Sequence, residues 1–533
     1  MWNGGIVKDS TAKKFAFLAA GAVSILVSFW ALSYSPVGNH EAYVAVTARQ
    51  MLNSGDWIVP VFNGEVRLNK TPLCYWLAAI AGKTAGGIND FIVRVPTAAL
   101  AVVSAMAIFY FVSEWLGVSI AVLSALIWST SLCFIRYSHT ARPEMALTVF
   151  VAISMLSFYS AINSESRKKQ ILYMLIFWVS FSLLMLAKGP APLPVIFPAL
   201  FLYFAIFRKW KFIPKLLPVS GVILFLLIFL PWPVAVLAKC PQAVEVWKNE
   251  FLGRAAGEYA AGAKPFYYYF KIMFVYMVPF SAFIPLAIAA PFYSVWEKKR
   301  KAMFYLWLWF IGGVAAMSLC GGKRQHHILP MMPAMAILAG VILDDMIFLH
   351  KAYSRKFSNI FLGAHLFIFS AGAVGVIVWL LKSSYAVRLV LVYSVLAVLA
   401  FLIAAAILFA MNRKVLAIVC FFAAICVLIM FWPCFESTQE NENYVIKDFA
   451  RNVSICADGR EVIAYCKVNA SFVYYFGRDV SVVSDIDRIC SQYPDSVGVI
   501  ATGKNFEQLK NDSRFLLSVE GIDNGRGFFV KIK

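Results

Sequence analysis

The chain has 533 residues, of which 61% are hydrophobic and 14% charged, and its formal net charge is +20. A mean hydropathy of +0.74 is far above the range of soluble domains, which excludes a water-soluble globular protein for most of the chain. A strongly basic balance can indicate nucleic-acid binding, but here the basic residues lie in short loops between apolar runs, so we expect no nucleic-acid partner.

About thirteen apolar runs follow one another up to Trp432, each about long enough, at roughly 20 residues, to cross a bilayer. Their predicted ranges are 15–34, 92–113, 117–137, 145–162, 170–187, 190–207, 214–237, 269–292, 302–320, 327–348, 358–381, 388–410 and 414–432. The first run lacks a convincing small-residue cleavage site, so it is interpreted as an anchor and not as a secretory signal. We therefore predict an all-α polytopic membrane domain over residues 1–433.

The basic loops predict the topology. Clusters of Lys and Arg recur in alternate loops, at 8–14, 167–169, 208–215, 298–301, 351–356 and 413–414. Because such clusters stay on the cytoplasmic side, the N-terminus is predicted to be cytoplasmic. The long loop 35–91, the loop 238–268 and the tail 434–533 then lie on the outer side.

The first outer loop, residues 35–91, is too apolar and too aromatic for a simple solvated connector. Its stretches 40–53 and 72–83 place apolar side chains beside polar ones and carry Tyr43, Tyr75 and Trp76, which favour the headgroup region of a membrane. We therefore expect two interfacial helices in this loop.

The tail reads as a small soluble α/β domain. Strands are predicted at 461–466, 479–483, 497–501, 515–520 and 528–532, and helices at 444–451 and 506–510. No glycine-rich phosphate loop and no metal-ligand spacing is recognisable there. Four cysteines lie in the tail or at its membrane edge, where an oxidising compartment would allow a disulfide among them: Cys434, Cys456, Cys466 and Cys490.

Polar residues gather at the predicted outer ends of the spans. They are His40, Glu41, Asp56, Arg67, Lys70, Arg94, His139, Arg142, Glu144, Lys188, Arg254, Lys264, Lys323, Arg324, His326 and His327. Carboxylates can act as general bases, and Lys and Arg can neutralise a phosphate leaving group. Such a set suits transfer from a lipid phosphate, a membrane-embedded donor that needs no nucleotide loop.

The order of the motifs resembles bacterial polyprenyl-phosphate-dependent glycosyltransferases of the GT-C class, similar to the 4-amino-4-deoxy-L-arabinose transferases of lipid A and to protein mannosyltransferases. The segments that carry the resemblance are Asn39-His40-Glu41-Ala42-Tyr43, Ser54-Gly55-Asp56-Trp57, Asn69-Lys70-Thr71-Pro72, Ala141-Arg142-Pro143-Glu144-Met145, Lys188-Gly189, Leu230-Pro231-Trp232, Lys264-Pro265-Phe266-Tyr267 and Gly322-Lys323-Arg324. The resemblance implies a GT-C-like fold and transfer of a hexosyl or pentosyl group from a polyprenyl-phosphate sugar to a lipid A, glycan or protein acceptor. The reaction would take place at the outer, periplasmic face of the bacterial inner membrane.

The resemblance also implies roles for particular residues. The family motif usually opens with Asp-Glu, and its Asp is taken as the base; His40 stands at that position and Glu41 at the next. Glu144 matches the second family carboxylate. The residues predicted to hold the donor phosphate are Lys70, Arg254, Lys323 and Arg324.

Other interpretations stay open. Glu41 can serve a helix start, Glu144 is favoured at a helix N-terminus by the dipole, and Lys70 can extend to the headgroups. Four outer-side histidines with Glu41 or Glu144 could hold a divalent metal ion, although their spacing is not diagnostic and no cofactor is assigned. A transporter or flippase of lipid-linked sugars, or a non-catalytic scaffold with the same fold, would also use headgroup-binding residues.

Overall fold

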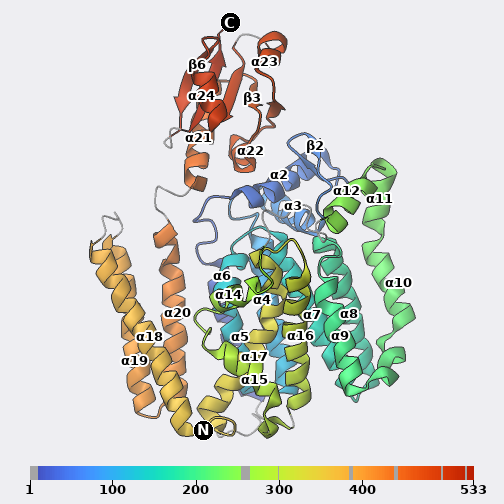
Figure 1. The fold of residues 1–533 in the computed structure, drawn as a ribbon, viewed down its shortest axis with the longest axis vertical. Coiled ribbons are helices and arrows are strands. Elements are labelled where there is room, and N and C mark those ends of the chain that lie inside the picture. The colour runs from blue at the N-terminus through green and yellow to red at the C-terminus, as the bar shows by residue number, and fades with distance from the viewer. Residues whose placement is uncertain are drawn as a thin grey trace. The chain divides into compact units, whose positions relative to one another are not determined.

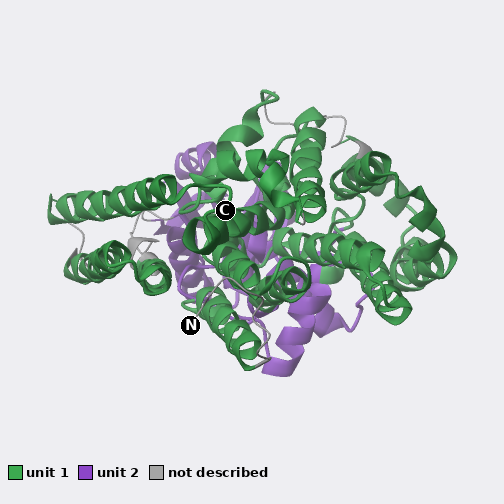
Figure 2. Cartoon of the chain, turned by 90° about the horizontal axis from the view of Figure 1, so that it is seen from below, with its two compact units in different colours: residues 1–31, 68–73, 97–434 green, residues 32–67, 74–96, 435–533 purple. Residues whose placement is uncertain are grey.

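The computed structural model describes residues 10–253, 264–297, 299–382, 388–436, 442–493, 496–521 and 525–532. They form two compact units (Figure 2). The first, called here the membrane unit, comprises residues 1–31, 68–73 and 97–434. The second, called here the loop–tail unit, comprises residues 32–67, 74–96 and 435–533, so parts of the first outer loop and the tail form one body.

The membrane unit is helical throughout its described residues (Figure 1). Its α-helices are α1 (Ser10–Phe29), α4 (Val95–Trp115), α5 (Val118–Ser129), α6 (Leu132–Ser138), α7 (Pro143–Asn163), α8 (Arg167–Lys188), α9 (Leu193–Phe207), α10 (Pro218–Phe229), α11 (Pro231–Lys239), α12 (Ala243–Lys248), α14 (Tyr268–Tyr276), α15 (Phe283–Ala289), α16 (Arg300–Leu319), α17 (Met332–Asp344), α18 (Arg355–Lys382), α19 (Arg388–Ala410) and α20 (Lys414–Glu436). Short 3-10 or π turns are η1 (Trp210–Leu216), η2 (Asn249–Gly253), η3 (Ala290–Phe292), η4 (Ser294–Trp296), η5 (Gln325–Met331) and η6 (Asp345–Leu349).

Ten helical segments in the described residues are long and apolar enough to cross a membrane. The pair α5 and α6 passes the same test with a bend of 59°, and two shorter apolar helices lie at Leu193–Phe207 and Phe283–Phe292. Each of these overlaps one of the predicted runs. The polytopic helical fold is therefore confirmed, while the count of about thirteen crossings stays a prediction.

Burial separates central from peripheral helices. α7 and the segment Gln325–Leu349 are almost completely buried, whereas α18 and the segment Pro218–Lys239 expose most of their apolar residues. A helix that is apolar on every side, but of which only a small part is buried by protein, is expected where lipid and not water covers the surface. The chain is a multi-pass membrane protein.

The loop–tail unit contains both helices that were predicted in the first outer loop. They are α2 (Asn39–Ser54) and α3 (Leu73–Ala85), with a short hairpin of β1 (Val61–Phe62) and β2 (Glu65–Val66) between them. α2 begins after Gly38, whose backbone N–H donates to the Glu41 carboxylate at 3.1 Å. It ends at Gly55, whose φ of 72° is the left-handed conformation that glycine adopts at little cost.

The tail folds as the predicted α/β domain. It contains α21 (Glu442–Ala457), β3 (Val462–Tyr465), α22 (Ala470–Phe476), β4 (Ser481–Val483), α23 (Ile486–Gln492), β5 (Gly498–Thr502), α24 (Lys504–Lys510), β6 (Phe515–Glu520) and β7 (Arg526–Lys531). The strand order is β4-β3-β5-β7-β6; β3 pairs in parallel with β4 and β5, and β7 pairs antiparallel with β5 and β6. All five predicted strands form.

Helices cover both faces of this sheet. Side chains of α21 and α22 join one buried cluster with Val462, Ala464 and Ile500, and side chains of α23 and α24 join another with Ile463 and Val499. Alternate residues of a strand point to opposite faces, so the tail has three layers. The sequence reading missed α22 and α23, because each has only seven residues and Ser471–Phe476 is rich in aromatic residues that also favour strands.

The predicted disulfide is absent among Cys456, Cys466 and Cys490, which are all free thiols. Cys456 packs against the cluster on the α21 side of the sheet, whereas Cys466 and Cys490 pack against the cluster on the other side. The side chain of Cys434 lies outside the described residues.

Candidate functional site

One cluster of charged residues in the membrane unit is centred on Lys70 and Glu250. The Lys70 ammonium forms a short ion pair with Glu250 Oε1, and the Glu250 side chain is only 8% exposed. Glu250 lies in η2, directly after α12, and the indole of Trp247 in α12 donates to the carbonyl of Leu68 at 3.1 Å. Residues 68–73 are therefore held against the segment that carries Glu250.

A second cluster surrounds Glu144 at the start of α7. Pro143 occupies the first turn of this helix, where its missing N–H costs nothing and where the helix dipole favours a carboxylate. The Glu144 carboxylate is 3.1 Å from Lys188 Nζ, 3.2 Å from Arg142 Nε and 3.5 Å from His326 Nε2. Glu144 Oε2 is buried and makes no hydrogen bond in the described residues. Cations thus outnumber the carboxylate they share.

The two clusters are neighbours. Lys188 is the last residue of α8, which ends at Gly189 with φ 62°. A Cβ atom at Gly189 would lie 2.7 Å from ring atoms of Phe251, the residue after Glu250. The turn that carries Glu250 therefore packs directly against the end of the helix that carries Lys188. Counted together, Lys70, Arg142 and Lys188 exceed Glu144 and Glu250 by one positive charge, before any protonation of His326.

Lys323 and Arg324 lie just before η5, the turn that brings His326 to Glu144. Lys323 Nζ donates to the carbonyl of Cys320 at 2.9 Å, and the Arg324 side chain is exposed. His327, next to His326, lies 3.3 Å from the hydroxyl of Tyr269. The segment 323–327 thus belongs to the same region of the membrane unit through His326. Arg254 lies outside the described residues.

The chain is similar in sequence to known proteins. The family described as dolichyl-phosphate-mannose-protein mannosyltransferase matches residues 69–234. An uncharacterized protein of Aquifex aeolicus is 31% identical over 60% of the chain and 62% of its own length. An undecaprenyl phosphate-alpha-4-amino-4-deoxy-L-arabinose arabinosyl transferase of Pseudomonas aeruginosa strain UCBPP-PA14 is 26% identical over 59% of the chain and 58% of its own length. The chain thus spans about three fifths of the length of these relatives.

Solved structures share the whole fold. The crystal structure of ArnT from Cupriavidus metallidurans bound to undecaprenyl phosphate superimposes with a TM-score of 0.80 and 15% identity, covering 98% of each chain. The oligosaccharyltransferase AglB of Archaeoglobus fulgidus gives a TM-score of 0.52 at 12% identity, covering 92% of this chain and 70% of its own.

The chain thus has the GT-C fold of ArnT, and over about three fifths of its length its sequence is similar to polyprenyl-phosphate-dependent glycosyltransferases. Its apolar helices and its bacterial relatives make it a multi-pass protein of the bacterial inner membrane.

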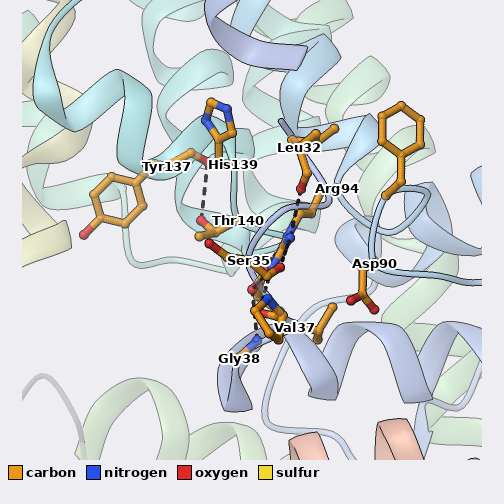
Figure 3. Close-up of polar contacts among 12 residues, drawn as sticks. Leu32, Ser35, Val37, Gly38, Asp90, Arg94, Tyr137, His139 and Thr140 are labelled. Atoms are coloured by element: carbon orange, nitrogen blue, oxygen red, sulfur yellow. Dashed lines mark hydrogen bonds and ion pairs between the residues drawn. The ribbon is translucent and has the colours of Figure 1, made fainter. Parts of the chain in front are cut away.

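Within this GT-C fold, Glu41 makes a different kind of contact. Both of its carboxylate oxygens lie 2.8 Å from the guanidinium of Arg94, and both side chains are buried. The same guanidinium donates to the carbonyls of Leu32, Ser35 and Pro36 (Figure 3). Burial alone would lower the pKa of Arg94, but the charge of Glu41 and the hydrogen bond to it outweigh burial and raise that pKa. In the described residues this ion pair is balanced.

His40 differs from Glu41 although the two are adjacent. His40 lies in the first turn of α2 and its side chain is exposed, whereas that of Glu41 is buried. The motif positions His40 and Glu41 therefore belong to the loop–tail unit, while Lys70, Glu144, Lys323 and Arg324 belong to the membrane unit.

Sequence reasoning left Lys188, His326 and Glu250 out of the predicted site. Lys188 and His326 were recognised as outer-end polar residues, and Lys188 also stands in a family motif, so both carried a signal. Glu250 carried none, because a single acid in a loop gives no indication of its partner. No group of three or more His, Cys, Asp or Glu side chains placed to hold a metal ion occurs in the described parts of the chain.

Proposed function

We propose that the chain transfers a sugar from a polyprenyl-phosphate carrier to an envelope acceptor at the periplasmic face of the inner membrane. The observation that carries this proposal is the excess of cations over carboxylates around Lys70, Glu250, Glu144 and Lys188 in the membrane unit. A group of partly buried cations with one charge in excess favours a phosphate anion over a neutral ligand. The named activity of the Pseudomonas relatives supports the same reaction.

Lys70 is the residue best suited to the donor phosphate. Its side chain is 29% exposed and its ammonium is paired with Glu250, so a phosphate oxygen could replace that carboxylate without a movement of the backbone at Lys70. Lys188, Lys323, Arg324 and Arg254 would add charge around the same phosphate. When the sugar–phosphate bond breaks, the carrier leaves as a phosphate monoester whose added negative charge these cations stabilise.

The acceptor oxygen must lose a proton as it bonds to the anomeric carbon. Glu144 is a candidate to accept that proton or to orient the acceptor, because its Oε2 makes no hydrogen bond in the described residues and is paired by charge with Arg142. His40 is the other candidate, since it is exposed and an imidazole accepts protons near neutral pH. We propose that Glu41 acts through its neighbour: with Arg94 it holds the loop that presents His40.

The proposal includes an orientation and a donor class. The N-terminus would be cytoplasmic and the tail periplasmic, as the alternate basic loops indicate. Both pentosyl and hexosyl donors fit the family. The undecaprenyl-phosphate donor named for the Pseudomonas relatives is the first to test, followed by mannosyl donors. Acceptors to test are lipid A, glycan and protein.

The decisive experiment is sugar transfer by the purified full chain from radiolabelled polyprenyl-phosphate sugars. We expect label to appear in an acceptor fraction, and we expect Lys70→Ala to lower the transfer rate by about 10²-fold, as for loss of one charge-stabilising donor. Lys211→Ala is a matched control, because Lys211 is exposed and lies in η1, a segment that carries none of the proposed site residues. Full activity of Lys70→Ala would contradict the role given to Lys70.

The rival functions give different results in the same assay. A flippase would move the labelled lipid between leaflets of a proteoliposome without releasing the sugar from its carrier. A non-catalytic scaffold would be silent, and His40→Asp, which restores the residue usual in the family, would then generate transfer. Transfer by the unaltered chain excludes both rivals.

A further inference from the structure

A cavity of about 300 Å³ lies within the loop–tail unit. Its lining comes from the start of α2, from α21 and α22, from the loop after β3, and from β5 and β7. The residues that matter for its chemistry are Asn39, Glu442, Lys467, Thr502 and Arg526 around the rim, with Ile446, Phe449, Phe472 and Ile500 below them.

The strand order explains why a cavity forms here. β4 and β5 lie on opposite sides of β3, so the chain runs from β3 outward to β4 and then returns across β3 to β5. α22 makes the first crossing on one face of the sheet, and α23 makes the second on the other face. The loops after β3 and β5 therefore leave in opposite directions, and in open α/β sheets ligands bind in the crevice at this point.

The cavity residues occupy that crevice. Lys467 and Asn469 lie in the loop between β3 and α22, and Thr502 is the last residue of β5. Arg526, the first residue of β7, pairs in register with Thr502. Asn39 reaches the same place from the first outer loop, since its Oδ1 accepts a hydrogen bond from the Ala470 N–H at 2.7 Å.

The floor of the cavity is apolar and partly aromatic. Ile446, Phe449 and Phe472 are each at most 5% exposed, and the rings of the two phenylalanines lie 5.8 Å apart. A floor of this kind accepts the apolar face of a ring. It would not stabilise a bare ion such as inorganic phosphate, which has no apolar surface to bury.

The rim carries a net positive charge. Arg526 is only 14% exposed and its Nη2 lies 3.3 Å from Glu442 Oε1, while Glu442 is 72% exposed and can turn to solvent at little cost. Lys467 is exposed, and in the described residues its side chain makes no ion pair. Among the described lining residues, two cations face one displaceable carboxylate, and the Asn39 amide and the Thr502 hydroxyl supply neutral hydrogen-bonding groups.

We propose that this cavity binds an anionic sugar unit: a monosaccharide ring that carries a phosphate or a carboxylate. The ring would lie on the aromatic floor, its hydroxyls would bond Asn39 and Thr502, and its anionic group would lie between Lys467 and Arg526. The volume is at the lower end of that of small-molecule sites, about 300–1,000 Å³, which suits one such unit. A role in choosing the acceptor would rest on the proposed transfer, but binding itself does not.

The test uses the full chain in a neutral detergent and glucose 6-phosphate as the probe. Ligand-observed ³¹P and ¹H NMR should show saturable binding, weakened about tenfold or more by Lys467→Ala and by Arg526→Gln, because each removes a charge-assisted contact. Lys467 is exposed, so its substitution leaves the fold intact even if that of Arg526 does not. Lys510→Ala is the matched control: Lys510 lies on α24, which covers the opposite face of the sheet, and its substitution should change nothing.

Competition identifies the source of the sugar. Displacement of glucose 6-phosphate by a phosphorylated glucosamine lipid in mixed micelles would assign a glycolipid headgroup, and displacement only by soluble sugar phosphates would assign a free sugar; both support the site. Equal binding of neutral glucose, equal competition by inorganic phosphate, or affinity unchanged in Lys467→Ala would overturn the proposal. Since binding and not transfer is measured, its failure is distinct from failure of the glycosyltransferase proposal.

Discussion

Buried carboxylates in the two units have different surroundings. In the loop–tail unit, Glu41 is matched by the single guanidinium of Arg94, and the Asp90 carboxylate accepts bonds from Tyr474 at 3.0 Å, from Tyr475 at 3.1 Å and from Lys447 at 3.1 Å. In the membrane unit, Glu144 faces Lys188 with Oε1 and Arg142 with Oε2, so two cations share one carboxylate.

This difference separates a structural role from a binding role. A buried carboxylate matched by one cation holds two segments together, and removing its partner leaves a buried charge. A set of cations that shares too few carboxylates keeps the capacity to bind a further anion. Charged residues alone therefore do not mark a functional site; an imbalance of charge among buried groups is the better indication.

The largest expected effect breaks the balanced pair. Arg94→Met leaves Glu41 buried without its cation, so we expect the loop–tail unit to lose about 3–5 kcal/mol of unfolding free energy. Thermal unfolding in detergent, monitored through the susceptibility of the tail to a protease, measures this loss. The double variant Glu41→Leu with Arg94→Met should recover much of it, because no unpaired charge remains. If the single variant is as stable as the parent, Arg94 and Glu41 do not hold the loop.

Asp90 offers a second, smaller test of the balanced unit. Asp90→Asn keeps the shape but removes the charge that two tyrosine hydroxyls and Lys447 share, and we expect a loss of about 1–3 kcal/mol in the same unfolding measurement. Asp458→Asn is the matched control, since Asp458 is exposed and should tolerate the change within about 0.5 kcal/mol. An equal loss in both variants would remove the special role of Asp90.

The unbalanced cluster should respond in the opposite direction. Glu250→Gln releases Lys70 from its carboxylate, so we expect binding of polyprenyl phosphate to tighten by up to about tenfold, or about 1.4 kcal/mol. The measurement is the Kd for the carrier lipid, with Glu245→Gln, an exposed residue of the same segment, as control. Weaker binding by Glu250→Gln would mean that Glu250 positions Lys70 and does not compete with the phosphate.

The smallest effect concerns alkaline pH. Burial, followed by the charge of Asp90, raises the pKa of Tyr475 above its ordinary value of about 10. The folded unit therefore keeps this tyrosine neutral after the unfolded chain has begun to ionise. Its contribution to stability is complete below pH about 10 and is lost as the pH rises toward the folded pKa.

The unfolding free energy of Tyr475→Phe should accordingly fall less steeply with pH than that of the parent above pH about 10. At pH about 10.5 the effect of this difference in slope should be below about 1 kcal/mol. Melting temperature against pH measures it. Tyr493→Phe, in the same unit, should follow the parent curve. Identical curves for Tyr475→Phe and the parent would show that Tyr475 ionises normally.

The sequence by itself determined the helical membrane fold, the two helices of the first outer loop and the five strands of the tail, because these follow from local hydrophobicity and strand propensity. It also named Lys70 and Glu144 as candidates, through motifs whose order resembles that of the family.

Only the tertiary structure decided which charges meet. The pairing of Glu41 with Arg94, 53 positions apart, and of Lys70 with Glu250, 180 positions apart, depends on how distant segments pack, and no local pattern encodes it. The same holds for the union of the first outer loop with the tail, and for the cavity between β3 and β5. Whether a carboxylate forms a structural ion pair or belongs to a binding site depends on its neighbours in space, because burial and the number of facing cations set its electrostatic energy.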